Sequence, residues 1–269
     1  MKNDARRLSI LSTDEIDELF GLPHFSDDDR RLYFDLSAKE RELFDNTRTF
    51  SVAAHLVLQL GYFKAKRQFF SYEQESSVLN DLDYIAALYF PTKTLSRLKS
   101  PSRPIRAEQQ RAILDLFQYK QCDNEVKVDL EDKAQRVAML STQPIFIFRE
   151  LTQYLALHRI VMPSYRYMQE MIGRVVAYER TRIARLLSTC MTSLIDQQLA
   201  ALLRAESGVF RVSALKHEAK DFSYKELRHE VARRQFFQPL HEFAKQFLIT
   251  AGISNESGKY YASMVKFYT

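Results

Sequence analysis

The residues of this chain that are best suited to recognition chemistry are arginine, lysine and glutamine side chains that recur on predicted helices. Arginine and lysine neutralise phosphates, and arginine and glutamine also form paired hydrogen bonds with base edges in DNA. They gather in four places: a strip on residues 47–66, the residues just after it, a basic stretch at 91–106, and a hairpin at 149–176. The pattern predicts an anionic partner.

The stretch 149–176 predicts a helix, a short turn and a second helix. Leu151 and Leu155 share a face of the first helix, and Pro163 fits the first position of the second. Two helices joined by a tight turn can set a recognition helix in the major groove, but an ordinary helical hairpin has the same pattern. The second helix has an apolar stripe, and its opposite side is expected to face outward with Arg166, Gln169, Glu170 and Gly173.

Residues 47–66 predict a helix that is apolar nearly all round and therefore buried. Its polar residues form one narrow strip, which is either a solvated edge or a contact surface. Lys66 and Arg67 belong to a small basic cluster at the end of this helix. The strip residues are Arg48, Ser51, His55, Gln59, Tyr62 and Lys66.

The stretch TKTLSRLKSPSRPIR, within residues 91–106, contains closely spaced cations and two prolines, as expected of a domain boundary. Such a connector can follow a nucleic-acid backbone, although a solvated linker has the same composition. Its cations are Lys93, Arg97, Lys99, Arg103 and Arg106, and Arg111 follows on the next predicted helix.

The sequence contains no motif for catalysis: no Gly-rich phosphate loop, no paired histidines at metal spacing and no nucleophile elbow. His55 is better explained as a core or edge histidine than as a ligand, and Asp27–Asp29 as the start of a helix than as a metal site. Cys122 and Cys190 are expected to be free thiols in a reducing cytoplasm. We therefore expect no enzymatic activity, no metal and no cofactor.

Composition favours an all-α fold, because the 269 residues include only 6 Gly and 7 Pro. The 46% of hydrophobic residues suffice for a sizeable core, yet no run is long enough to span a membrane and no signal core is present. Residues 1–90 carry a net charge of −5 and residues 91–120 a net charge of +5. We expect a cytoplasmic protein. Its positive charge is concentrated from about residue 92 onward.

Helix-start signals divide the chain further. Ser12 and Ser37 each begin a capping box, and Ser26 precedes three acidic residues that suit the first turn of a helix, so three short helices are predicted. Later helices are expected at 78–89, from Pro104 to about 119, at 129–142 and from Ser223 onward. The chain ends at KYYASMVKFYT, within an amphipathic pattern, which suggests the start of a truncated domain.

Several long segments resemble one family in the same order along the chain. They are ILSTDEIDELFGLPHFSDDDRRLYFDLSAKERELF, FSVAAHLVLQLGYFKAKRQFF, SRPIRAEQQRAILDLFQY, ELTQYLALHRIVMPSYRYMQEMI and YYASMVKFYT. Together they resemble the N-terminal region of the large replicative bacterial transposases of the Tn-three family. The resemblance covers nearly the whole chain.

That resemblance implies an all-helical region that binds the terminal inverted repeats of a transposon. The family's metal-dependent catalytic domain would lie beyond residue 269. The implied organisation is two helical bundles with helix-turn-helix-like units, at 1–90 and 107–206, a basic linker at 91–106 and a partial helical segment at 207–269. Double-stranded DNA is the expected partner, with self-association or a full-length transposase as further partners. The alternative is a helical remnant that regulates a full-length transposase.

The resemblance joins the cationic and amide residues into one predicted DNA-facing series. Arg159, in the turn, is expected to contact the DNA backbone. Tyr165, Arg166 and Gln169 are expected to contact base edges or adjacent phosphates. The whole series is Arg48, Gln59, Lys66, Arg67, Lys93, Arg97, Lys99, Arg103, Arg106, Arg111, Arg159, Tyr165, Arg166 and Gln169.

Overall fold

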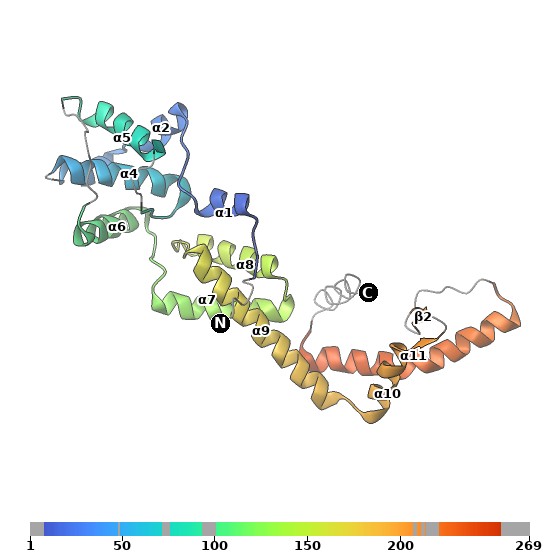
Figure 1. Cartoon of the computed structure of the whole chain (residues 1–269). Coiled ribbons are helices and arrows are strands. Elements are labelled where there is room, and N and C mark those ends of the chain that lie inside the picture. The colour runs from blue at the N-terminus through green and yellow to red at the C-terminus, as the bar shows by residue number, and fades with distance from the viewer. Residues whose placement is uncertain are drawn as a thin grey trace, which may run out of the picture. The chain divides into compact units, whose positions relative to one another are not determined.

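A computed structural model describes residues 8–47, 49–71, 76–92, 101–206, 209–210, 213 and 221–253 (Figure 1). The fold is all-α, as the composition predicts, and a strand pair of two residues each, β1 (Ala205–Glu206) with β2 (Val209–Phe210), is a minor addition. The helices are α1 (Thr13–Phe20), α2 (Asp27–Phe34), α3 (Ala38–Asp45), α4 (Phe50–Lys66), α5 (Ser76–Tyr89), α6 (Arg103–Phe117), α7 (Asn124–Leu140), α8 (Pro144–Leu157), α9 (Tyr165–Cys190), α10 (Ser193–Leu202) and α11 (Tyr224–Ala251).

The chain folds into two compact units. The first contains residues 1–132 and 148–172, and the second contains residues 133–147 and 173–269. The predicted organisation, with a linker at 91–106 between two bundles, stays a prediction. Helix α6 begins within that stretch, at Arg103, and packs on α3 and α4 within the first unit. The basic stretch therefore leads into a helix of the same unit.

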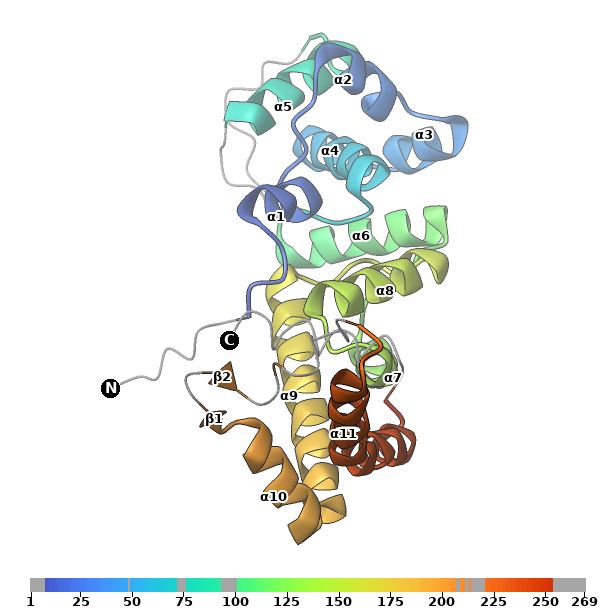
Figure 2. The ribbon, with the colours of Figure 1, turned by 90° about the vertical axis from the view of Figure 1, so that its right-hand side faces the viewer.

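Helix α4 is the centre of the first unit. Helices α2, α3, α5 and α6 all pack against it, and Figure 2 shows it enclosed between α2 and α5 on one side and α6 on the other. Every residue from Ala53 to Phe63 is buried. The sequence prediction of a helix buried nearly all round is confirmed. Ile113 of α6 and Ile85 of α5 complete the same core.

Capping boxes position three short helices around α4. Ser12, Ser26 and Ser37 each accept a hydrogen bond from the backbone N–H three residues later, and the acidic side chain at that position bonds back. Each box satisfies N–H groups that have no partner within the helix. The ends of these helices are thus set by local sequence.

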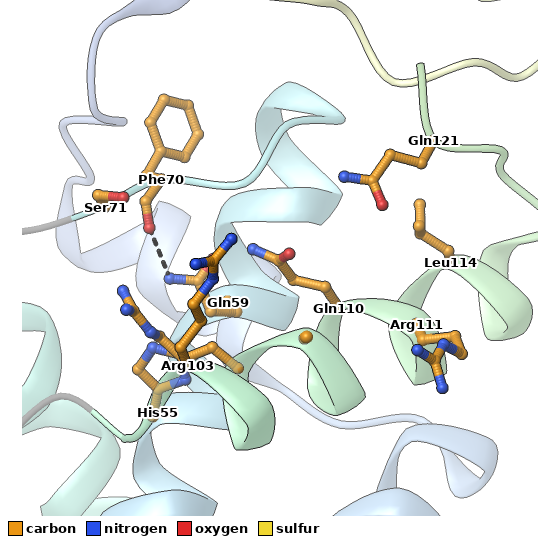
Figure 3. A pocket seen from close by; sticks show the side chains of 11 residues that line it. His55, Gln59, Phe70, Ser71, Arg103, Gln110, Arg111, Leu114 and Gln121 are labelled. Atoms are coloured by element: carbon orange, nitrogen blue, oxygen red, sulfur yellow. Dashed lines mark hydrogen bonds between the residues drawn. The ribbon is translucent and has the colours of Figure 1, made fainter. Parts of the chain in front are cut away.

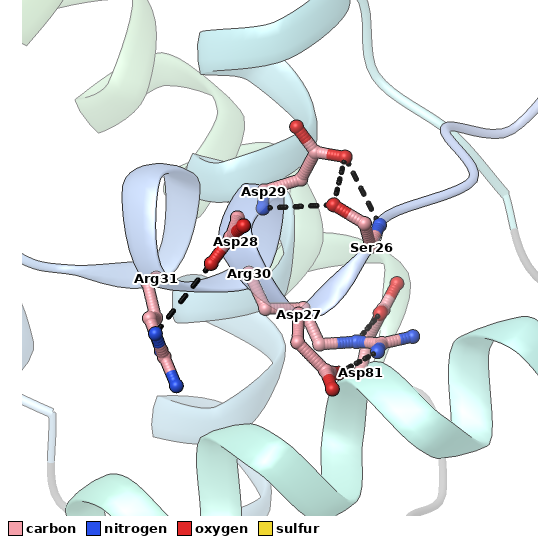
Figure 4. Close-up of polar contacts among 7 residues, drawn as sticks. All are labelled: Ser26, Asp27, Asp28, Asp29, Arg30, Arg31 and Asp81. Carbon is pink, nitrogen blue, oxygen red and sulfur yellow. Dashed lines mark hydrogen bonds and ion pairs between the residues drawn. The ribbon is translucent and has the colours of Figure 1, made fainter.

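Helix α2 is also tied to α5 by a charge pair. Asp81 of α5 is 1% exposed, and its carboxylate accepts from Nε of Arg30 at 2.8 Å (Figure 4). The hydroxyl of Tyr62 in α4 donates to the same carboxylate at 3.0 Å. Burial raises the pKa of Asp81, and its hydrogen bonds with Arg30 and Tyr62 lower it. Three helices therefore meet at one buried carboxylate.

In the second unit, α10 packs against α11, and Arg182 of α9 holds the end of α11. Its Nη2 donates to the carbonyl of Ala251 at 2.7 Å while its guanidinium pairs with Glu179. Gly252 follows in the left-handed conformation, with φ +64°, that ends many helices. Within the described residues, no helix is long and apolar enough to cross a membrane.

Candidate nucleic-acid interface

A pocket of about 340 Å³ lies between α4 and α6 in the first unit. Figure 3 shows Gln59 and His55 of α4 beside Arg103 of α6, with Arg111 and Gln121 farther along α6 and beyond it. Apart from Ala107, Leu114 is the apolar residue of α6 that lines the pocket. The lining residues are His55, Gln59, Phe70, Ser71, Arg103, Arg106, Ala107, Gln110, Arg111, Leu114 and Gln121.

The beginning of α6 concentrates positive charge at this pocket. Ser102 precedes the helix but makes no side-chain cap hydrogen bond, and the first turn contains no acidic residue. Instead Arg103 and Arg106 lie there, where the helix dipole is already positive. This arrangement costs helix stability, whereas an anion bound to the N-terminus would offset the cost. Pro104 fits because that position has no use for an N–H.

Three arginines of the pocket have no carboxylate partner within the part of the chain that the structure describes. Among the described residues, Arg103, Arg106 and Arg111 form no ion pair with a carboxylate, and Nε of Arg106 is buried without a hydrogen-bond partner. Arg103 and Arg111 are exposed and Arg106 is half-buried. Three unneutralised guanidinium groups on one helix attract phosphates, which they can hold through two parallel hydrogen bonds.

Gln59 forms part of the pocket floor and is only 2% exposed. Its Nε2 donates to the carbonyl oxygen of Phe70 at 3.0 Å, as the dashed line in Figure 3 shows. Because that carbonyl only accepts, the bond fixes the orientation of the amide. The buried Oε1 then remains without a hydrogen-bond partner among the described residues.

His55 lies beside Gln59 and is buried, with 4% of its surface exposed. Its Nδ1 lies 2.6 Å from Oε1 of Gln109, whose Nε2 donates to the carbonyl of Val52 at 2.8 Å. The second bond fixes the Gln109 amide, so Nδ1 of His55 must donate. Burial lowers the pKa of His55, the Gln109 hydrogen bond raises it, and the charge of Arg106 lowers it. The residue is a core histidine, as the sequence favoured.

Four predicted residues from two separate sequence regions meet at the pocket: Gln59 from α4, and Arg103, Arg106 and Arg111 from α6. The chain arrangement thus brings the end of the basic stretch against the polar strip of residues 47–66. The predicted residues Arg48, Lys93, Arg97 and Lys99 lie outside the described residues.

Three residues of the strip are buried, which disfavours the solvated edge, one of the two interpretations that the sequence left open. His55, Gln59 and Tyr62 are 4%, 2% and 0% exposed, since α6 and α5 cover them. Nζ of Lys66 donates to the carbonyl of Glu18. A pocket built from α4 and α6 lies at this place.

Arg67 is engaged within the fold. Its guanidinium lies 5.4 Å from the ring centre of Phe117, 5.8 Å from that of Tyr119 and 5.9 Å from that of Phe63. Such contacts between a cation and aromatic faces are favourable. Arg67 also ends α4 in the left-handed conformation, with φ 55°. A role in packing accounts for this residue.

The hairpin forms as α8 and α9, but the second helix begins at Tyr165, two residues after Pro163. Gln169 does not face outward as expected, because it and Tyr165 are half-buried and bonded to the segment before α1. The Tyr165 hydroxyl accepts from the N–H groups of Ile10 and Leu11, at 3.4 and 3.3 Å. Nε2 of Gln169 donates to the carbonyl of Leu8 at 2.7 Å.

Arg159 and Arg166 have different environments. Arg159 adopts φ 51° in the turn, its carbonyl accepts from Lys120 at 2.8 Å, and its Nη1 reaches Gln118 at 3.4 Å. Its backbone thus ties the turn to the segment after α6. The Arg166 side chain is 70% exposed and pairs with Glu170 at 2.9 Å. A surface pair of this kind is weak, so Arg166 remains accessible to an anion.

Sequence reasoning missed the pocket residues Gln110, Gln121, Ser71 and Phe70, as well as the supporting residue Gln109. Their types carry no signal of their own, and only the packing of α6 on α4 assembles them. Within the described part of the chain, no group of three or more His, Cys, Asp or Glu residues is arranged to hold a metal ion.

Comparison with protein-family models matches residues 10–175 to a domain of unknown function (DUF4158). The matched span covers more than half of the chain and includes the pocket, α8 and the beginning of α9. A comparison with curated proteins found no match.

Proposed function

The chain belongs to the DUF4158 family, and from this premise we propose that it is a DNA-binding module of a transposase that recognises the terminal inverted repeats of a transposon. This domain is commonly found at the N-terminus of Tn-three family transposases. The resemblance of the sequence segments to that family supports the same reading. The proposal assigns no catalytic step to these residues.

The observation that carries the proposal is the cluster of Arg103, Arg106 and Arg111 at the pocket beside α4. These cations form no ion pair with a carboxylate of the described residues, and two of them lie at an uncapped helix N-terminus. Cations placed in this way favour the binding of phosphates. Duplex DNA presents a regular track of phosphates that such a surface can follow.

Phosphate contacts set position, and base contacts set sequence preference. In the proposed module, the α6 arginines supply phosphate contacts that are independent of sequence. Arg166 is exposed at the beginning of α9. In the proposed module it is the hairpin residue that contacts a base edge. Arginine is suited to this because its guanidinium donates two parallel hydrogen bonds to guanine in the major groove.

A gel-shift titration tests the proposal with two labelled duplexes, one carrying the terminal repeat of the associated element and one with the same bases scrambled. The repeat duplex is expected to bind at least about tenfold more tightly, since a mismatched base pair typically costs about 1–3 kcal/mol. Arg103→Ala should weaken both complexes alike, whereas Arg166→Ala should reduce the difference between them. Equal binding of the two wild-type complexes would contradict the proposed specificity.

A second candidate function is association with a full-length transposase. It is favoured by apolar side chains at the beginning of α11, where Leu227 and Val231 are 50% and 56% exposed and lie on one face. Phe222 and Tyr224, just before them, are 94% and 77% exposed. Exposed apolar groups of this kind often mark a protein contact. Co-purification with that transposase, lost in Leu227→Glu, would support this function.

A further inference from the structure

The floor of the α4–α6 pocket requires a hydrogen-bond donor from its ligand. Oε1 of Gln59 is buried and has no partner among the described residues, while Nε2 of the same amide is already bonded to Phe70. The amide cannot rotate to exchange the two atoms, because two carbonyl oxygens would then face each other. A buried acceptor without a partner costs about 1–3 kcal/mol, which a donor group of a ligand would recover.

The arginines of the same pocket require the opposite chemistry. Arg103, Arg106 and Arg111 only donate, and Nε of Arg106 is buried without a partner. They fit an anion such as a phosphate. An ionised phosphate diester has only acceptors, so it cannot satisfy Gln59. A single ligand that satisfies both parts must carry a phosphate and an N–H or O–H donor a short distance away.

A nucleotide has this combination, because every base carries an N–H donor on its pairing edge. In an intact duplex that edge is occupied by the opposite base. Gln59 is also only 2% exposed, so the edge of a stacked base pair cannot reach it. A base that has left the stack can enter the pocket.

We infer that the α4–α6 pocket binds one unpaired nucleotide of a DNA strand, with its base toward Gln59 and its phosphate on Arg103 and Arg106. The volume of about 340 Å³ lies in the range of small-ligand pockets and suits one such unit. Guanidinium planes also stack on unpaired bases, and this gives the arginines a second use. The inference rests on the proposed function for its anionic partner, and it adds a site that duplex binding alone does not need.

Three DNA probes test the inference with the full chain. The first is a blunt duplex, the second carries a short single-stranded extension, and the third carries the same extension built from abasic units, which keep the phosphates. The base-containing extension is expected to bind about tenfold more tightly than the abasic one, in line with about 1–3 kcal/mol for one well-held base. Equal affinities for the two extensions would overturn the inference.

The same set separates this inference from the proposed function. Binding of the blunt duplex with no gain from the base-containing extension would leave duplex recognition intact and exclude an unpaired nucleotide in the pocket. If the chain prefers the base-containing extension but does not bind the blunt duplex, the result would support a nucleotide in the pocket and contradict duplex recognition. Failure of all three probes to bind would overturn both.

Two matched variants assign the effect to Gln59. Gln59→Met removes the acceptor at similar length and should abolish the preference for the base over the abasic unit. Gln68→Met is the control, because Gln68 is also buried and also donates to a backbone carbonyl, that of Leu19 at 2.9 Å, but does not line the pocket. Loss of the preference in both variants, or in neither, would contradict the role of Gln59.

Discussion

Nδ1 of His55 lies 2.6 Å from Oε1 of Gln109, and this buried hydrogen bond joins α4 to α6 below the arginine cluster. Gln109 in turn donates to the carbonyl of Val52, so α6 is bonded to both a side chain and the backbone of α4. The two helices that form the pocket are therefore held in register by polar groups inside the fold. Because burial of the ring disfavours its charged form, the stability of this pairing depends on the protonation of His55.

This dependence predicts a pH effect on stability. The pKa of His55 is lowered in the folded state, so the unfolded chain binds its proton first as the pH falls below about 6.5. The free energy of unfolding should therefore decrease on acidification, by at most about 1.4 kcal/mol per pH unit from this group. The stabilising contribution is complete above the unfolded pKa and is lost between it and the folded pKa.

Urea unfolding of the wild type and His55→Asn across that pH range measures the effect. The variant has no imidazole to protonate, so its stability should change less between neutral and mildly acidic pH. Subtracting the two curves removes the shared contribution of carboxylates such as Asp81, whose pKa is raised. A variant whose pH dependence matches that of the wild type would contradict the assignment to His55.

The buried carboxylate of Asp81 predicts a large loss of stability on substitution. Asp81→Ala leaves the guanidinium of Arg30 half-buried, with only the exposed carboxylate of Asp27 as a counterion. Removing one partner of a buried ion pair typically costs about 3–5 kcal/mol. Denaturant unfolding of the purified variant measures the change.

Asp28→Ala is the matched control, because Asp28 also pairs with an arginine of α2, Arg31, but at the surface (Figure 4). Its side chain is 92% exposed and the pair is separated by 3.5 Å. Loss of such a pair should cost less than about 1 kcal/mol. Similar losses for Asp81→Ala and Asp28→Ala would show that burial of the Asp81 pair has no energetic consequence.

Gly61 and Gly173 form a second matched pair. A Cβ at Gly61 would overlap the ring of Phe34 in the core, whereas a Cβ at Gly173 on α9 would meet no atom within 4 Å. Gly61→Ala should destabilise by about 1–3 kcal/mol through overpacking, despite the better helix propensity of alanine. Gly173→Ala should stabilise by up to about 1 kcal/mol. Thermal unfolding of both variants tests whether Gly61→Ala lowers the stability and Gly173→Ala raises it.

The segment before α1 is held by α9, which predicts a local effect of Tyr165→Phe. The variant loses the hydroxyl that accepts from the N–H groups of Ile10 and Leu11. These two amides should then exchange with solvent faster, while the amides of α4 keep their protection. Hydrogen exchange resolved by residue measures this, and unchanged exchange at Ile10 and Leu11 would show that the hydroxyl does not hold the segment.

The sequence is most informative where the deciding interactions are local. The capping boxes at Ser12 and Ser37 predict the beginnings of α1 and α3 because donor and acceptor lie three residues apart, and the acidic residues after Ser26 predict the beginning of α2. The burial of α4 follows from its apolar residues on every side. The all-α class follows from the same local preferences.

The sequence is least informative about which polar side chains face a partner. Gln169 has the helical position of an outward residue, but Leu8, far earlier in the chain, occupies its amide. Gln59 appears on a polar strip, but α6 covers the strip and makes it the floor of a pocket. Helical periodicity describes one helix at a time, so contacts between distant segments are not encoded in it.

The salt dependence of DNA affinity tests the central claim most directly, since the claim is that α6 presents unpaired cations to phosphates. Each phosphate contact releases a counterion, so the logarithm of the association constant should fall linearly with the logarithm of salt concentration. We predict that Arg103→Ala and Arg111→Ala each reduce the slope by about 1, as one lost phosphate contact requires.

Lys39→Ala is the control for this measurement, because it removes the same charge from an exposed position on α3 that does not line the pocket. It should leave the slope unchanged while the two arginine variants lower it. A slope that is the same in all four proteins, or that falls equally in Lys39→Ala, would contradict the assignment of the α6 arginines to the DNA backbone.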